Sequence, residues 1–104
     1  MLQTIHRFSE RVIFGSSTYA ARVIGERQRD GRYTGRVAFL PVGHGPVLVT
    51  AVETTQSNVD ALQHWAARLS PVYLDGALAR AIARRQSRAA ARAGTSIFTV
   101  PLLR

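Results

Sequence analysis

An arginine stands at every fourth position near the end of the chain, and this row is the feature that most strongly indicates chemistry. On a helix that rises about 1.5 Å per residue, its guanidinium groups extend over roughly 18 Å. The planar guanidinium fork pairs with phosphate and carboxylate groups. The row therefore predicts a helix face that follows the phosphates of RNA or DNA. Its members are Arg80, Arg84, Arg88 and Arg92, with Arg85 beside them.

A second group of arginines surrounds the Asp30-Gly31 dipeptide. Arg27, Arg29, Arg32 and Arg36 flank it, and Asp-Gly between two alternating segments is typical of a β-hairpin turn. A positively charged hairpin tip can enter a nucleic-acid groove. We therefore predict that Arg29 and Arg32 belong to the same nucleic-acid-binding surface as the row.

The overall charge favours a polyanionic partner, although codon usage or pairing with carboxylates would also account for it. The 104 residues carry a net charge of +8, and all fourteen basic residues are arginine. Such a charge attracts polyanions without a specific site. However, a GC-rich genome also favours arginine, and runs of charge are usually solvated surface. As a further alternative, the arginines pair with carboxylates such as Glu10, Glu26 or Glu53, within the fold or across the interface of a homodimeric scaffold with no nucleic-acid role.

The sequence lacks the patterns of catalytic and metal sites. It has no cysteine, and His6, His44 and His64 are not spaced as metal ligands. Glu53 and His64 could meet at the end of one strand, but there is no nucleophile motif and no glycine loop to hold a nucleotide phosphate. We therefore expect no enzymatic activity, no cofactor, no bound metal and no small-molecule ligand.

Hydropathy predicts a chain that does not enter a membrane. No apolar run reaches the roughly 18 residues of a membrane span. Residues 1–14 lack the uninterrupted apolar core of a secretory signal. We expect a cytoplasmic protein, by default a bacterial one.

The elements that must position the arginines are predicted from periodicity. Residues 47–52 are apolar on both faces and rich in β-branched side chains, which predicts an inner strand. Ser57, with Asp60 three residues later, predicts the N-cap of a helix over residues 58–69. The apolar stripe of that helix contains Val59, Leu62, Ala66 and Leu69.

Two more strands precede this segment, and a second helix follows it. Residues 18–28 and 32–42 alternate as antiparallel strands, and Asp30-Gly31 predicts a type I′ turn between them. The second helix, over about residues 74–93 with Pro71 or Asp75 near its start, carries the arginine row and has Gly94 as its expected C-terminal cap residue.

The two ends of the chain add weaker signals. Apolar residues at helical spacing over residues 2–13 predict a short N-terminal helix. Residues 96–103 alternate as a strand, and Pro101 would place that strand at a sheet edge or at a contact between subunits.

These elements predict a single small α+β domain over residues 1–104. Three antiparallel strands, with the C-terminal tail as a possible fourth edge strand, pack against two helices. Strands followed by a helix are similar in outline to double-stranded RNA-binding domains and to partner domains of bacterial toxin–antitoxin systems. The chain carries the signature residues of neither, and a shared outline does not imply a shared function. The exposed tail edge and the alanine face of the second helix make a homodimer the alternative expectation.

Overall fold

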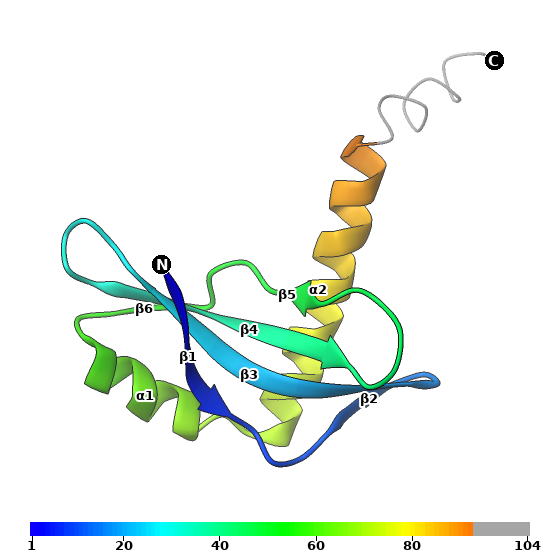
Figure 1. Cartoon of the computed structure of the whole chain (residues 1–104), viewed down its shortest axis with the longest axis horizontal. Helices are drawn as coiled ribbons and strands as arrows, with labels where there is room; N and C mark the ends of the chain where they lie inside the picture. Colours follow the sequence, from blue (N-terminus) through cyan, green and yellow to red (C-terminus); the bar gives the residue numbers. More distant parts are fainter. Residues whose placement is uncertain (93–104) are drawn as a thin grey trace.

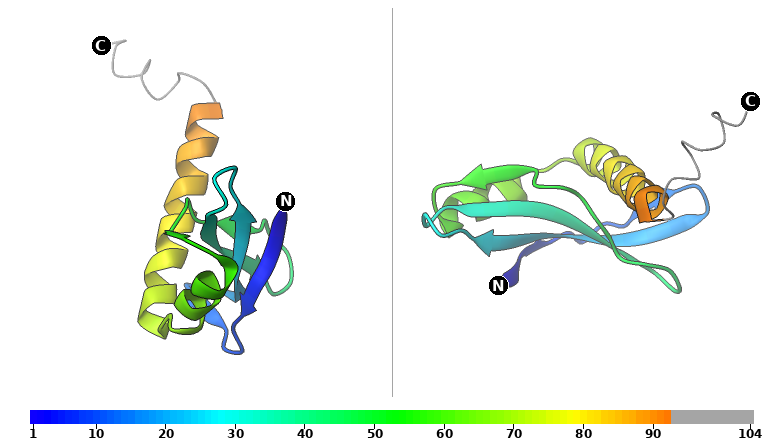
Figure 2. Two further views of the ribbon diagram at one scale, coloured as in Figure 1. Left: turned by 90° about the vertical axis from the view of Figure 1, so that its left-hand side faces the viewer. Right: turned by 90° about the horizontal axis from the view of Figure 1, so that it is seen from above.

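The six strands of residues 1–92 form one antiparallel sheet, and both helices cover the same face of it (Figure 1 and Figure 2). This arrangement is seen in a computed structural model, which describes residues 1–92. It confirms the α+β class, but the expected three-stranded sheet is too small. The elements are β1 (Leu2–Arg7), β2 (Val12–Phe14), β3 (Ser17–Arg27), β4 (Tyr33–Pro41), β5 (Leu48–Val49), β6 (Thr54–Gln56), α1 (Val59–Ala67) and α2 (Pro71–Arg92).

The β3–β4 hairpin is the centre of the sheet, as the alternation predicted, but its turn is not of type I′. That turn needs positive φ at both central residues, and among residues 28–32 only Gly31 has it, with φ 88°. Gly31 N–H donates to the Gln28 carbonyl (3.0 Å), and Gln28 N–H donates to the Arg32 carbonyl (2.7 Å). The loop therefore has three residues, with Gly31 in the left-handed position that such loops require.

The predicted N-terminal helix is wrong, because residues 2–13 form β1 and most of β2 instead. β1 pairs with β3, and its register shifts between Thr4 and His6. This bulge inserts Ile5 as an extra residue, so Ile5 and Phe8 both reach the core. A bulged strand can thus place apolar residues three apart on one face, which periodicity alone attributes to a helix.

The predicted inner strand over residues 47–52 is also wrong, because this segment lies at the edge of the sheet and is interrupted. β5 and β6 both pair with β4, and Val47 and Val52 are exposed. Between the two short strands, Thr50 is fully buried. Its Oγ1 accepts from Val37 N–H (3.0 Å), and its N–H donates to the Val37 carbonyl (3.0 Å).

Helix α1 is anchored by a contact between one leucine and two glycines. Gly25 and Gly35 face each other across β3 and β4, and Leu62 of α1 lies directly over them. A Cβ atom added at either glycine would lie 2.7 Å from a Leu62 methyl carbon. The N-cap of the helix is Asn58 rather than the predicted Ser57, because the Asn58 side chain accepts from Ala61 N–H (2.8 Å).

Helix α2 begins at Pro71, one of the two residues predicted near its start, where a missing N–H costs nothing. Ser70 Oγ accepts from Tyr73 N–H (3.1 Å) just after this start. The first half of α2 packs on the sheet, and the second half continues past the sheet edge (Figure 1). Its buried residues are Leu74, Ala77, Leu78 and Ala81. The predicted cap at Gly94 and the predicted strand over residues 96–103 lie outside the described residues.

We expect Gly35→Ala to destabilise the protein by about 1–3 kcal/mol, because the new methyl group overpacks the contact with Leu62. Urea denaturation followed by circular dichroism measures this change. The matched control is Gly76→Ala on α2, whose added Cβ would meet only Arg80 Nη1 (3.3 Å), an atom that does not itself bond to Glu53. That variant should be no less stable than the wild type, since alanine is favoured over glycine in a helix by about 0.5–1 kcal/mol. If Gly35→Ala is no less stable than the wild type, Leu62 does not hold α1 against the backbone.

We expect Thr50→Val to cost about 1–3 kcal/mol, because the buried Val37 N–H loses its acceptor while the side-chain volume hardly changes. Thermal and urea unfolding measure the loss. Thr55→Val, at an exposed position of β6, removes a hydroxyl that makes no such bond, and this variant should match the wild type. Equal stability of the two variants would show that the Thr50 hydroxyl is dispensable.

Candidate nucleic-acid interface

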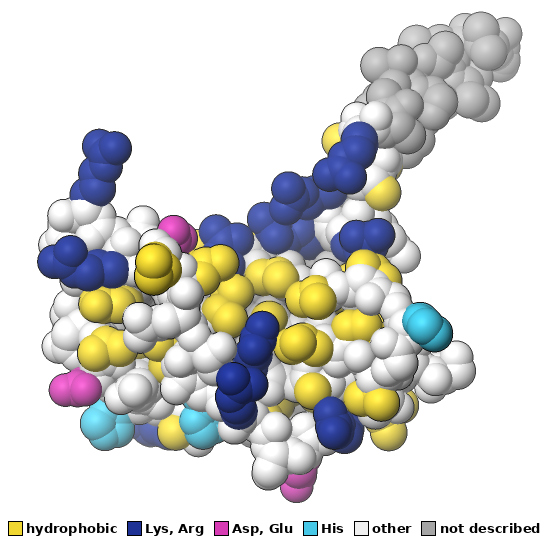
Figure 3. Space-filling model, viewed as in Figure 1, with side chains coloured by type: hydrophobic (Ala, Val, Ile, Leu, Met, Phe, Trp, Pro, Cys, Tyr) yellow, Lys and Arg dark blue, Asp and Glu magenta, His cyan; other side chains and the backbone are white. Residues whose placement is uncertain are grey.

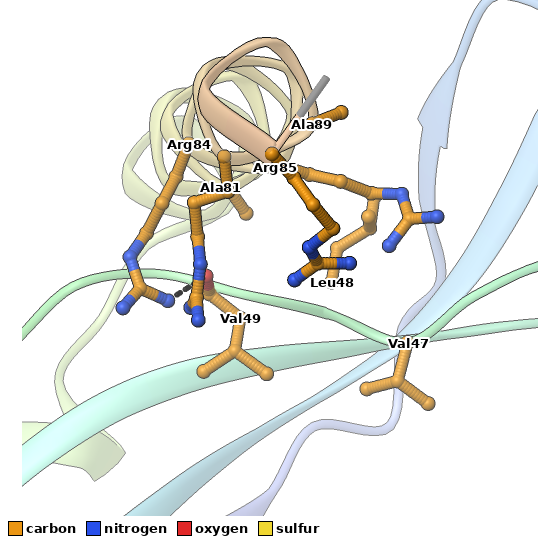
Figure 4. Close-up of a pocket in the computed structure, with 9 residues that line it drawn as sticks. Val47, Leu48, Val49, Ala81, Arg84, Arg85 and Ala89 are labelled. Atoms are coloured by element: carbon orange, nitrogen blue, oxygen red, sulfur yellow. Dashed lines mark hydrogen bonds between the residues drawn. The ribbon is translucent and has the colours of Figure 1, made fainter. Parts of the chain in front are cut away.

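Four arginines of α2 line a groove between the second half of the helix and β5 (Figure 4). We call this site the arginine groove. Its volume is about 200 Å³, and its floor is apolar. Figure 4 shows Arg84 reaching from α2 to β5, where its Nη1 donates to the Val49 carbonyl (3.3 Å). The groove is lined by Arg84, Arg85, Arg88 and Arg92, with Val47, Leu48, Val49, Ala81 and Ala89.

Helix geometry explains why these four side chains share one face. Each four-residue step turns about 40° further around an α-helix, so three steps of the row cover about 120°. Viewed down the helix axis, Arg84, Arg88 and Arg92 therefore span about 80°, and Arg85 lies about 20° beyond Arg92. Arg80 lies about 40° from Arg84 on the opposite side of this arc. Alanines at positions 81 and 89 are small, which leaves room for the groove beside β5.

Arg80, which belongs to the predicted row, does not line the groove. Its Nη2 lies 2.6 Å from Glu53 Oε1, and its Nε lies 3.2 Å from Glu53 Oε2. Tyr73 also donates to Glu53, and the Arg80 guanidinium carbon lies 5.4 Å from the Tyr73 ring centroid. Trp65 meets the same ring edge to face, with centroids 6.0 Å apart. Arg80 is therefore part of a contact that joins α1, α2 and the β5–β6 connection.

The charge of Glu53 is maintained by its partners. The Glu53 side chain is only 10% exposed, and this burial opposes ionisation. The hydrogen bonds from Arg80 and Tyr73 and the Arg80 charge outweigh burial, so the pKa of Glu53 is lowered. Burial, followed by the bond to Glu53, raises the pKa of Tyr73 to about 12. At neutral pH the ionised Glu53 and Arg80 therefore form one hydrogen-bonded unit with the neutral hydroxyl of Tyr73.

The hairpin arginines separate into paired and free groups. Arg32, which belongs to the predicted surface, bonds through Nε to Asp30 Oδ2 (2.8 Å) in an exposed ion pair at the tip. Arg27 and Arg29 are exposed, and no carboxylate pairs with them among residues 1–92. Arg36 lies further along β4, opposite Ile24 of β3. Of the two predicted hairpin residues, Arg29 is therefore unpaired and Arg32 is ion-paired, and Arg27 is a further unpaired arginine within residues 1–92.

Two other features considered from the sequence do not come together. Glu53 is bonded to Arg80 and Tyr73, whereas His64 Nδ1 lies 3.0 Å from the Asp60 carbonyl on α1. Within residues 1–92 no cluster of three His, Cys, Asp or Glu side chains could hold a metal ion. In the same part of the chain, no helix is long and apolar enough to span a membrane.

Comparison of the chain with protein-family models, with curated proteins and with solved structures finds no match.

We expect Glu53→Gln to flatten the acid side of the stability profile. Because the folded pKa of Glu53 is below its ordinary value of 4.5, its charge stabilises the fold above that pH. This contribution is lost as the pH falls through the folded pKa. Urea denaturation from pH 6 to about pH 3 should therefore show a smaller loss of stability in Glu53→Gln. At neutral pH the variant should already be less stable by about 1.5–3 kcal/mol, as expected when bonds to a charged group are lost.

Glu10→Gln is the matched control, since Glu10 is exposed and makes no ion pair within residues 1–92. This variant should keep the acid slope of the wild type. The assignment fails if Glu53→Gln and the wild type lose stability in parallel between pH 6 and about pH 3.

Proposed function

We propose that this protein binds RNA or DNA by contacting phosphates with Arg84, Arg85, Arg88 and Arg92. The observation that carries the proposal is that these four cations share one groove and have no carboxylate partner within residues 1–92. The three ion pairs in that range use the N-terminus, Arg32 and Arg80 instead. Like charges four residues apart disfavour a helix by about 0.2–0.5 kcal/mol per pair, and a polyanion would relieve that repulsion.

The dimensions of the groove favour a polymer over a small molecule. Pockets for small ligands usually measure about 300–1,000 Å³, and the arginine groove holds about 200 Å³. The row from Arg84 to Arg92 instead extends over about 12 Å of helix. Duplex nucleic acid carries one negative charge per roughly 1.7 Å of its axis, so several phosphates lie within reach of the row.

The chemistry of the groove favours binding without sequence preference. Arginines that contact phosphates position a protein on nucleic acid, whereas readout of sequence needs contacts with base edges. The groove floor consists of valine, leucine and alanine side chains, which offer no hydrogen bonds to bases. Arg84 is held by the Val49 carbonyl, while Arg85, Arg88 and Arg92 are exposed. These last three are therefore the side chains to vary in a test.

We expect the triple variant Arg85→Glu, Arg88→Glu and Arg92→Glu to bind nucleic acid more weakly than the wild type and with a smaller salt dependence. Fluorescence anisotropy with a labelled 20-base-pair RNA duplex, over 50–300 mM salt, measures the slope of log affinity against log salt. Each phosphate contact adds about −0.9 to the slope, so the loss of three contacts should make the slope of the variant shallower than that of the wild type by about 2.7.

The matched control reverses Arg7, Arg11 and Arg68, which are exposed and lie outside the groove. It carries the same change in net charge, so any general charge effect appears in both variants. The control should keep the steep slope of the wild type. Equal slopes in the two variants, or no binding by the wild type at 50 mM salt, would contradict the proposal. Purification without nuclease, followed by the ratio of absorbance at 260 and 280 nm, gives an independent check.

A further inference from the structure

We infer that the ligand is a double-stranded nucleic acid held at two points, the arginine groove and the tip of the β3–β4 hairpin. This inference rests on the proposed function and specifies its ligand. Arg27 and Arg29 supply the second point, because both are exposed and have no carboxylate partner within residues 1–92. Figure 3 shows basic side chains at both ends of the upper rim of the molecule, with a dip in the outline between them.

The spacing of the two points follows from the register of the sheet. Arg27 pairs with Tyr33 at the hairpin end of β4, and Leu48 of β5 pairs with Phe39 further along the same strand. Six residues of strand at about 3.3 Å each separate these positions, a distance of about 20 Å. Leu48 lines the arginine groove, so the hairpin arginines and the groove lie about that far apart along the rim.

Along the rim between the two points, the described residues offer no unpaired cation that would hold a flexible strand, because Arg80, which reaches this stretch, is paired with Glu53. Residues 50–57, which connect β5 to α1 through β6, contain no basic and no aromatic side chain. A single strand crossing this stretch would have to be kept extended without contacts. A duplex, with a persistence length of about 150 base pairs, is straight over this distance and reaches both points without such help. Two-point binding therefore favours the stiffer ligand.

The aromatic side chains support the same conclusion. Proteins that bind single strands usually stack bases on exposed aromatic rings. Here Phe39 is fully buried, and Tyr19, Trp65 and Tyr73 pack against the core. Phe14 is 51% exposed, but it belongs to β2, which pairs with the end of β3 opposite the hairpin. The groove lining contains no aromatic residue. At the hairpin, Tyr33 lies opposite Arg27 and is half-buried, so one partly exposed ring is all that the two basic points offer for base stacking.

Fluorescence anisotropy at 100 mM salt tests the inference with four labelled probes: a 20-base-pair RNA duplex, a 20-base-pair DNA duplex, and one single strand of each. The wild type should bind at least one duplex about tenfold more tightly than its single strand. Arg27→Glu with Arg29→Glu should remove most of this preference and leave single-strand affinity within about twofold. The two duplex arms distinguish RNA from DNA as the source of the phosphates.

Two further variants keep this test decisive. Arg29→Glu alone changes an exposed loop residue that makes no bond with the rest of the hairpin, so it should fold and show part of the loss. Arg7→Glu with Arg11→Glu has the same charge change as the double hairpin variant and should keep the duplex preference. Equal affinity for duplex and single strand, or equal weakening of both by the hairpin variants, overturns two-point binding and leaves the proposed function intact. If the wild type binds none of the four probes, both conclusions fail.

Discussion

The contact between Leu62 and the paired glycines of the sheet is the constraint on which the rest of the structure depends. Because neither Gly25 nor Gly35 has a side chain, α1 lies close to the backbone of β3 and β4. This close approach brings Trp65 against Tyr73 of the following helix. Tyr73 and Arg80 then meet Glu53 at the edge of the sheet. The direction of α2, and the projection of its second half beyond the sheet, follow from this chain of contacts.

Patterns among neighbouring residues predicted the elements that depend on those residues. They failed for the elements whose structure depends on pairing with residues far away in the sequence. The β3–β4 hairpin and both helices were predicted because alternation, a glycine turn and helical periodicity are properties of neighbouring residues. β1 was mistaken for a helix because its bulge is visible only once it pairs with β3. The break between β5 and β6 depends on Thr50 bonding to Val37, thirteen residues away. The glycines at positions 25 and 35 did carry a signal, since glycine inside a strand indicates close approach of another segment.

The same distinction applies to the candidate site. The spacing of the arginines correctly placed them on α2, and the groove beside β5 could not be foreseen because β5 is brought there by the fold. Arg80 was assigned to the row by its four-residue spacing. Its pairing with Glu53, 27 residues away, becomes visible only in the folded chain. Arg32 is a different case, since Asp30 is only two residues away and its carboxylate also accepts from the Arg32 backbone N–H (3.0 Å). An aspartate in a turn commonly bonds the backbone two residues on, so this pairing was readable from the sequence.

The position of Trp65 also determines what the optical properties of the protein report. It is the only tryptophan, and its ring lies between the sheet and Tyr73, at the junction of the two helices. Its emission is therefore sensitive to separation of α1 from α2 and to loss of the Tyr73 ring beside it. The arginine groove and the hairpin tip are formed by other residues. Tryptophan emission therefore reports on the junction of the two helices and not directly on either basic surface.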